Sequence, residues 1–287
     1  RNPLGTAPGA AFETEDKVVV VLPGPPREFV PMVDEQVAPY LKERVGEGAE
    51  VIKSRVLRIA GLGESSVEER VKHLLKGSNP TVAPLAGSGE VHLRITAKAG
   101  NGRQAEALID EMSRKLVAML GSAVFGKDDE SLERVVVENL IQRGLTLATA
   151  ESCTGGLISN RITDVAGSSA TLLAGVVTYS NQAKRELLGV PEELLIQYGA
   201  VSEQVARAMA EGARRLVGAD VAISATGIAG PGGGTPEKPV GLVYLGLSSS
   251  RGTTVVRHQL SGCRADIKLR TSQAALDLIR TSLTNLP

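Results

Sequence analysis

Residues 145–156 read Leu-Thr-Leu-Ala-Thr-Ala-Glu-Ser-Cys-Thr-Gly-Gly, and the interpretation of the whole chain starts from this stretch. An apolar run leads into polar residues, and after the two glycines apolar side chains recur at helical spacing from Leu157 to Val165. This pattern predicts a strand over 145–150, a tight turn, and a helix over 154–165. A strand that turns directly into a helix is typical of α/β proteins.

Ser152 and Thr154 lie at the predicted start of that helix, where hydroxyl residues are favourable caps. The first N–H groups of a helix have no partner within it, so they can hold an anion or the oxyanion of an acyl-transfer transition state. Gly155 and Gly156 would let a ligand approach the backbone closely. Ser152 is therefore a candidate nucleophile, and the alternative is that it only caps the helix.

The rest of the C-terminal half alternates between helical and strand patterns. We predict helices over 131–143, 181–188, 192–198, 203–217 and 264–284, and strands over 172–179, 220–226, 240–247 and 253–259. The alternation predicts a three-layer α/β domain, a mixed sheet with helices on both faces and a ligand crevice at the carboxyl ends of its strands. Three polar turns, at 151–156, 179–184 and 226–235, follow strand ends, so we expect them to converge.

The second and third turns carry further candidate residues. Tyr179 is expected to end its strand and Lys184 to lie one turn into the next helix; by themselves they read as a buried aromatic residue and a solvated charge. The turn from Thr226 and Gly227 to Thr235 is rich in glycine but lacks the G-x-x-x-x-G-K-[ST] pattern, so it does not predict a nucleoside triphosphate site.

Five blocks of this half match a known family in order. They are ATAESCTGG (148–156), GVVTYSNQAK (175–184), GAVSE (199–203), ATGIAGPGGG (225–234) and EKPVG (237–241). Over about residues 130–287 the chain resembles the C-terminal domain of the competence/damage-inducible CinA family. The resemblance implies a nicotinamide-nucleotide amidase, which hydrolyses the carboxamide of nicotinamide mononucleotide to nicotinate mononucleotide and ammonia.

The resemblance also implies roles for individual residues. Ser152 would be the nucleophile, Lys184 its base with a pKa lowered by desolvation, and Tyr179 a proton relay to the leaving ammonia. The residues implied in substrate binding are Thr154, Gly155, Thr226, Gly227 and Arg264, the last of these for the phosphate. No metal or cofactor is implied. Two alternatives stay open: an amidase in which Cys153 attacks with Glu151 as base, and a nucleotide-sensing module that binds without turnover. Cys263 is expected to be a small packed residue.

The pattern of residues 50–126 predicts a small α+β domain, which in the CinA family has a KH-like topology. The expected elements are strand 51–60, helix 65–76, strands 81–85 and 90–97, and helix 103–120. Ser65 and Glu68 form a capping-box pattern at the first helix. The stretch lacks a G-x-x-G clamp, so we expect a spacer or dimerisation role, hence a homodimer, rather than nucleic-acid binding. His73 and His92 have no second metal-type residue at ligand spacing.

Residues 1–49 read as the C-terminal part of another domain. Lys17–Leu22 predicts a strand and Phe29 lies in a following helix, whereas no element is predicted before Lys17. The segments NPLGTAPG (2–9) and LPGPPREF (22–29) resemble the end of the molybdopterin-binding-like domain of CinA proteins. Most of that domain's nucleotide site would lie outside this chain, so we do not assign its ADP-ribose pyrophosphatase activity. Residues 126–130 are expected to be a linker to the amidase-like domain, 127–287.

Composition limits the kinds of partner. The chain has 32 basic and 32 acidic residues, which gives no net field to attract nucleic acid or an anionic membrane. An apolar run of about 18 residues, the length that spans a bilayer, is missing from the sequence. Two cysteines, Cys153 and Cys263, are too few for a disulfide framework. These features predict a cytoplasmic protein, and the resemblance to the CinA family implies that its partner is a small pyridine nucleotide.

Overall fold

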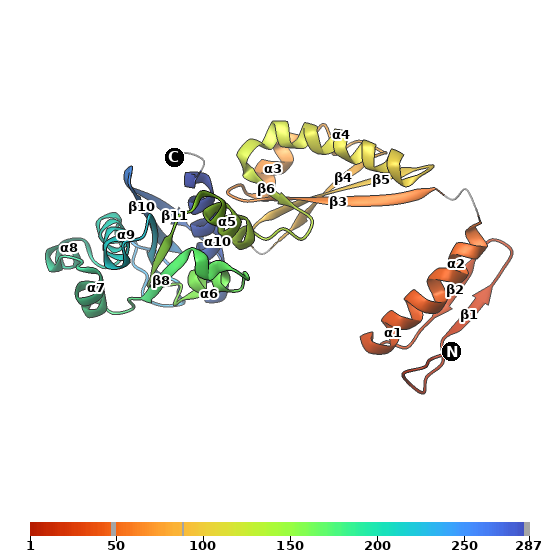
Figure 1. Ribbon diagram of the computed structural model, residues 1–287, viewed down its shortest axis with the longest axis horizontal. Coiled ribbons are helices and arrows are strands. Elements are labelled where there is room, and N and C mark those ends of the chain that lie inside the picture. Colours follow the sequence, from red (N-terminus) through yellow and green to blue (C-terminus); the bar gives the residue numbers. More distant parts are fainter. Residues whose placement is uncertain (47–49, 88, 284–287) are drawn as a thin grey trace. The chain divides into compact units, whose positions relative to one another are not determined.

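The computed structural model describes residues 1–46, 50–87 and 89–283, and it is of the predicted α/β class (Figure 1). It divides into two compact units. One comprises residues 1–52 and 98–105, and the other comprises residues 53–97 and 106–287. The domain boundary predicted at residue 49 and the helix end predicted at residue 284 lie outside the described residues.

The first unit contains a hairpin followed by helices. Strands β1 (Ala10–Glu13) and β2 (Val18–Val21) pair antiparallel, and α1 (Pro26–Met32), a π-helical turn (Val33–Val37) and α2 (Ala38–Val45) follow. The absence of any element before Lys17 was a wrong prediction, because β1 is a strand. All four residues of β1 are exposed, so the sequence shows no alternation of buried and exposed side chains there.

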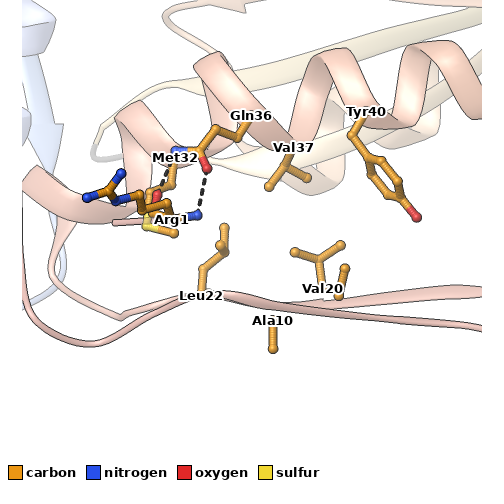
Figure 2. Close-up of a pocket in the computed structure, with 10 residues that line it drawn as sticks. Arg1, Ala10, Val20, Leu22, Met32, Gln36, Val37 and Tyr40 are labelled. Atoms are coloured by element: carbon orange, nitrogen blue, oxygen red, sulfur yellow. Dashed lines mark hydrogen bonds between the residues drawn. The ribbon is translucent and has the colours of Figure 1, made fainter. Parts of the chain in front are cut away.

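Apolar side chains of β2 and the helices line a hollow of about 150 Å³ (Figure 2). Val20 and Leu22 face Met32 and Val37 across it. The Arg1 amino group closes one end by donating to Gln36 Oε1 over 2.9 Å. The other face of β2 is open, and Val19 and Val21 are more than half exposed.

Within the second unit, the sheet of the small domain has the strand order β4-β5-β3-β6. Its elements follow the predicted order: β3 (Val51–Ile59), α3 (Glu64–Val71), β4 (Thr81–Ala86), β5 (Val91–Ala99), α4 (Gly102–Leu120), a 3-10 turn (Gly121–Ala123) and β6 (Val124–Lys127). Val67 and Val71 of α3 are fully buried, as are Leu93 and Ile95 of β5. Alternate residues of β5 are buried, which is the pattern of a sheet with one covered face.

Three expectations for this domain were wrong. Helix α3 ends at Val71, whereas the predicted helix ran to residue 76. Helix α3 has Gly63 as its N-cap and no side-chain cap, so Ser65 lies inside the helix and the capping box does not form. The segment predicted as a linker from Gly126 includes the end of β6, which pairs antiparallel with β3 at Leu57↔Lys127. β6 has four residues of which only Phe125 is buried, and such a short edge strand leaves no periodic signal.

The larger domain is the predicted mixed sheet, in the order β11-β10-β9-β7-β8. β7 is parallel to β8 and β9, whereas β10 is antiparallel to β9 and β11. Helices α5, α6 and α10 cover one face and α7, α8 and α9 cover the other (Figure 1). The strands are β7 (Leu147–Glu151), β8 (Leu172–Val177), β9 (Val221–Gly227), β10 (Leu242–Ser249) and β11 (Gly252–Gln259). The helices are α5 (Leu132–Arg143), α6 (Leu157–Thr163), α7 (Asn181–Leu188), α8 (Glu192–Tyr198), α9 (Glu203–Val217) and α10 (Arg264–Leu283), with a 3-10 turn at Ser168–Ala170.

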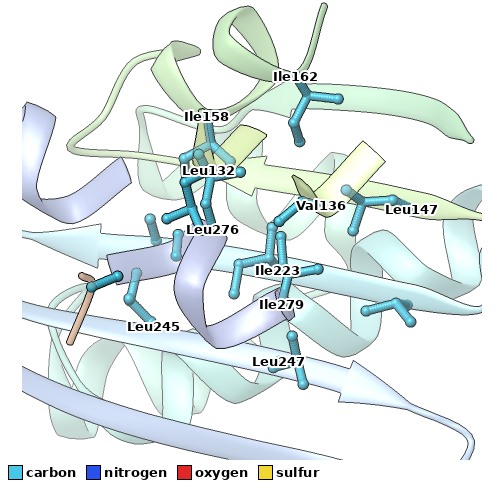
Figure 3. Close-up of a cluster of buried hydrophobic side chains, with 14 of the residues drawn as sticks. Leu132, Val136, Leu147, Ile158, Ile162, Ile223, Leu245, Leu247, Leu276 and Ile279 are labelled. Atoms are coloured by element: carbon cyan, nitrogen blue, oxygen red, sulfur yellow. The ribbon is translucent and has the colours of Figure 1, made fainter. Parts of the chain in front are cut away.

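The core explains why β7 is the central strand. All five of its residues are buried, and successive side chains enter different clusters. Leu147 packs with α5, α6 and α10 on one face (Figure 3), while Ala148 packs with α7, α8 and α9 on the other. A strand buried on both faces reads as an almost continuous apolar run, which is the signal in residues 145–150.

A polar network joins the two domains of the second unit through α10. Gln273 Nε2 donates to Glu90 Oε2 over 3.0 Å, and Gln273 Oε1 accepts from Arg161 Nη2 over 2.7 Å. Glu90 also accepts from Arg58 and is 2.6 Å from His92 Nε2. The charges pair across long sequence separations, so sequence spacing did not indicate this contact.

Candidate active site

The three polar turns meet at the carboxyl ends of β7, β8 and β9. They line a hollow of about 210 Å³, here called the Ser152 pocket. It is lined by Ser152, Cys153, Tyr179, Lys184, Ala200, Val201, Thr226, Gly227, Ala229 and Arg264. Six of the eight residues singled out in the sequence are among these. Thr154 and Gly155 are not, and Thr154 is fully buried.

Lys184 and Ser152 face one another across this pocket. Ser180 caps α7 by accepting from Ala183 N over 3.0 Å, which places Lys184 one turn into the helix with its side chain buried. Lys184 Nζ lies 3.2 Å from Ser152 Oγ and 2.9 Å from the Thr178 carbonyl oxygen, with the Tyr179 carbonyl at 3.4 Å. The solvated charge expected from the isolated pattern is therefore a buried one.

Burial lowers the pKa of Lys184, because desolvation disfavours the ammonium form; the nearby Cys153 opposes the shift. In the neutral form the amine has two N–H groups and one lone pair. Two carbonyl oxygens, of Thr178 and Tyr179, can accept the two N–H groups, and the lone pair is left for the Ser152 hydroxyl proton. This geometry suits a general base acting on Ser152.

The predicted anion site at the helix start is wrong. β7 runs to Glu151, and α6 begins at Leu157 after Gly156, so neither Ser152 nor Thr154 caps the helix. The buried Glu151 carboxylate accepts from Ile158 N at 3.0 Å and from Ser159 N at 2.8 Å. An acidic group satisfies the helix N-terminus in this way, so these N–H groups are not free for an oxyanion.

Glu151 is thus a positioning residue that the sequence considered only as an alternative base. Its carboxylate also accepts from Ser159 Oγ over 2.8 Å, and Ser159 Oγ lies 2.6 Å from Thr149 Oγ1. These bonds fix both ends of the turn that carries Ser152. The available signal was an acidic residue a few positions before a helix start, a favourable place for negative charge.

The cysteines do not fit a thiolate mechanism. Cys153 is buried, and burial raises the pKa of its thiol to about 12. The Glu151 carboxylate is directed to α6 by three hydrogen bonds, so its oxygens are committed there. Cys263 was expected to be packed, but it is exposed, because it precedes α10 in the open turn after Gly262.

Arg264 links the second and third turns. Its guanidinium donates to the Gly230 carbonyl over 2.7 Å and to the Tyr179 hydroxyl over 3.0 Å. Tyr179 lies two residues beyond β8 and is 62% exposed, so the expectation of a buried strand-end residue was wrong. Thr226 lines the pocket, and its Oγ1 donates to the Ala200 carbonyl over 2.7 Å.

Lys238 is a pocket-supporting residue that sequence reasoning missed. Its Nζ donates to the carbonyl oxygens of Tyr198 over 2.6 Å and Val201 over 2.8 Å. It therefore ties the glycine-rich loop to the connection between α8 and α9, where Val201 lines the pocket. The signal was present in the EKPVG block, which contains this lysine.

Two further properties concern the described residues only. No group of three or more His, Cys, Asp or Glu side chains among them is arranged to hold a metal ion. Within the same residues, every helix is too short or too polar to cross a membrane.

Fold and pocket together define a three-layer α/β domain with a buried lysine facing a serine at the strand ends, preceded by a small α+β domain. The family described as CinA C-terminal domain matches residues 129–283, and the damage-inducible protein CinA KH domain matches residues 54–126. The chain belongs to the CinA family.

Relatives and solved structures agree with this assignment. A putative competence-damage inducible protein of Moorella thermoacetica is 54% identical over 98% of this chain and 68% of its own length. The relative of that name in Thermoanaerobacter pseudethanolicus is 50% identical over 99% of this chain and 68% of its length. The crystal structure of competence/damage inducible protein CihA from Agrobacterium tumefaciens has a TM-score of 0.51 and 46% identity, covering 53% of this chain and 93% of that one.

Proposed function

We propose that the protein is an amidohydrolase that converts nicotinamide mononucleotide and water to nicotinate mononucleotide and ammonia. The observation that carries the proposal is the 3.2 Å approach of Lys184 Nζ to Ser152 Oγ inside the Ser152 pocket. The lowered pKa of Lys184, caused by burial, supports its role as a base. The family's nicotinamide-nucleotide amidase activity, implied by the five matched blocks, supplies the substrate.

In the first half-reaction, neutral Lys184 accepts the Ser152 hydroxyl proton while Ser152 Oγ attacks the carboxamide carbon. The positive charge on Lys184 then lies beside the oxyanion that forms, and it provides the stabilisation that the α6 N–H groups cannot. The carbon–nitrogen bond breaks, and the leaving nitrogen takes a proton from Lys184 as ammonia departs. Tyr179 relays this proton, since its hydroxyl already accepts from Arg264 and retains its own proton to donate.

In the second half-reaction, water hydrolyses the ester on Ser152. Lys184 accepts a proton from the water, the hydroxide adds to the ester carbon, and the bond from that carbon to Ser152 Oγ breaks. Ser152 Oγ regains its proton from Lys184, which restores the neutral pair. One water is consumed and one ammonia is released, and no electrons are exchanged with a cofactor.

The test is to incubate the protein with nicotinamide mononucleotide and to measure ammonia and nicotinate mononucleotide. We expect both products from the parent protein, only a small residual rate from Ser152→Ala, and most of the activity from Cys153→Ala. A protein that binds the nucleotide without releasing ammonia would instead be a sensing module. Loss of activity in Cys153→Ala with retention in Ser152→Ala would transfer the nucleophile's role to the cysteine.

We also propose a cytoplasmic homodimer that binds no nucleic acid. Two free cysteines, one of them exposed, suit a reducing compartment, and the balanced charge favours no polyanion. β8 is an edge strand of its sheet, and Leu173 and Val177 on it are almost half exposed, a surface that proteins usually cover. Light scattering of the purified protein measures the mass, and a monomer would contradict the dimer.

A further inference from the structure

A second hollow adjoins the Ser152 pocket, and Arg264 lines both. Leu157, Ala265 and Lys268 complete the second hollow, here called the Lys268 cleft, whose volume is about 410 Å³. Since α10 begins at Arg264, the two basic residues lie four positions apart, which is one turn of the same helix. A ligand that extends over the Arg264 side chain can therefore contact both hollows.

Pocket size indicates that a mononucleotide needs both hollows. Small-molecule sites usually measure roughly 300–1,000 Å³, and the Ser152 pocket measures about 210 Å³. The reacting carboxamide must lie against Ser152 Oγ, so the pyridine ring fills this pocket. The ribose and its phosphate then extend toward the Lys268 cleft.

Arg264 already has protein partners for its guanidinium. It donates to the Gly230 carbonyl and to the Tyr179 hydroxyl, so two of its five donors hold the pocket wall together. Lys268 differs: within the described part of the chain no acidic side chain or carbonyl accepts from its Nζ. The nearby acid on α10, Asp266, accepts from Cys263 N over 2.9 Å and so is committed to the helix start.

The position of Lys268 places its charge beside the nucleophile turn. A Cβ built on Gly155 would lie 3.7 Å from Lys268 Nζ, so the ammonium is next to the backbone three residues after Ser152. Its side chain is half-buried, which limits screening by solvent. An ammonium with three uncommitted donors is a suitable partner for a phosphate.

We propose that Lys268 binds the 5′-phosphate of the substrate in the Lys268 cleft, while the Arg264 side chain lies between the pyridine ring and the phosphate. The proposal rests on the proposed amidase function and assigns the residue that recognises the phosphate of its substrate. Nicotinamide riboside, which lacks the phosphate, gains nothing from Lys268.

The experiment measures binding of nicotinamide mononucleotide and of nicotinamide riboside by calorimetry, using Ser152→Ala protein so that hydrolysis during the titration is negligible. Adding Lys268→Gln should weaken mononucleotide binding about tenfold to a hundredfold, the scale for one hydrogen bond to a charged group, and leave the riboside unchanged. Lys268→Arg should retain most of the affinity. Arg270→Gln is the matched control. It removes the same charge from the same helix, but at a residue that lies outside the cleft and donates to Ser261 Oγ.

Equal mononucleotide affinity with and without Lys268→Gln would overturn the proposal. An equal loss of affinity for the mononucleotide and the riboside would also overturn it, as would a Ser152→Ala parent that does not bind the mononucleotide. Ammonia release by the unmodified protein is assayed separately. If it releases no ammonia but the mononucleotide shows the Lys268-dependent binding, the amidase function fails and the phosphate site stands. Thermal melts of each variant check that the fold is retained.

Discussion

Ser152 and Lys184 should behave as one catalytic unit, and a double-mutant cycle tests this directly. Their atoms are 3.2 Å apart, so the proton passes between them without an intermediary. General-base catalysis contributes roughly a hundredfold to ten-thousandfold, which corresponds to about 2.7–5.4 kcal/mol of transition-state free energy. We therefore expect Lys184→Met to lower kcat/KM for nicotinamide mononucleotide by a factor in that range.

The double variant is the informative measurement. Without the Ser152 hydroxyl, the ester that Lys184 helps to form and to hydrolyse cannot form. Ser152→Ala with Lys184→Met should therefore be no slower than Ser152→Ala by itself. The assay is ammonia release, with kcat/KM determined for the parent, both single variants and the double variant. Losses that add as free energies would refute the reasoning, because they would show that each residue acts independently.

The stability of Lys184→Met needs its own check. The change leaves the buried Thr178 carbonyl without its donor, at a cost of about 1–3 kcal/mol, and it also removes a buried amine. Thermal unfolding shows whether the variant is folded at the assay temperature. Cys153→Ala is the control for a change in the same pocket, and it should retain most of the activity.

Four other predictions follow from particular contacts. Since Lys184 must be neutral to act and burial lowers its pKa, kcat/KM should fall as the pH falls through that pKa. Between the lowered pKa and the ordinary value of 10.5, the folded state binds fewer protons than the unfolded state, so the free energy of unfolding should rise with pH over this range. Denaturant-induced unfolding at several pH values measures it. Glu151→Gln should reduce the unfolding free energy by about 2–3 kcal/mol, because its amide nitrogen would face N–H donors of α6, and an unchanged melt would contradict the capping role. Glu90→Ala should destabilise the protein by about 3 kcal/mol, since it leaves Arg58 without its buried partner; Lys115→Ala, which breaks an exposed pair, should have little effect. Limited proteolysis that removes residues 1–48 should leave amidase activity intact, and its loss would show that this segment belongs to the working unit.

The alternation of elements in the larger domain was predictable because its buried apolar side chains follow regular patterns. Leu147 to Ala150 form an apolar run, and Ile158 and Ile162 are four apart, which is the spacing of one helix face. The N-cap serines of α7 and α9, Ser180 and Ser202, accept from N–H groups of the first turn, and such caps are local signals as well. The elements that were missed, β1 and β6, have four residues each and few buried side chains.

In the candidate site, too, some features could be predicted before the structure was known and others could not. Ser152 was identified because it lies in a turn after a strand, a position that sequence patterns specify, whereas Lys184, Tyr179 and Arg264 were identified through the resemblance to the CinA family. Their partners were not, since hydrogen bonds select atoms by distance and direction rather than by spacing along the chain. Thr226 has a hydroxyl that suits a ligand, yet it donates to the Ala200 carbonyl 26 residues away.

The sequence by itself determined the α/β class and the three turns that carry polar residues, because secondary structure and side-chain chemistry are local properties. It also offered Ser152 as a candidate nucleophile, whereas the role of Lys184 came from the resemblance to the CinA family. Only the tertiary structure decided that Glu151 occupies the start of α6, that Lys184 is buried with a lowered pKa, and that Lys268 is a cation without a protein partner among the described residues. Each of these depends on which atoms distant in sequence come within about 3 Å, and on how much solvent packing excludes. Those quantities are set by the packed sheet and helices as a whole.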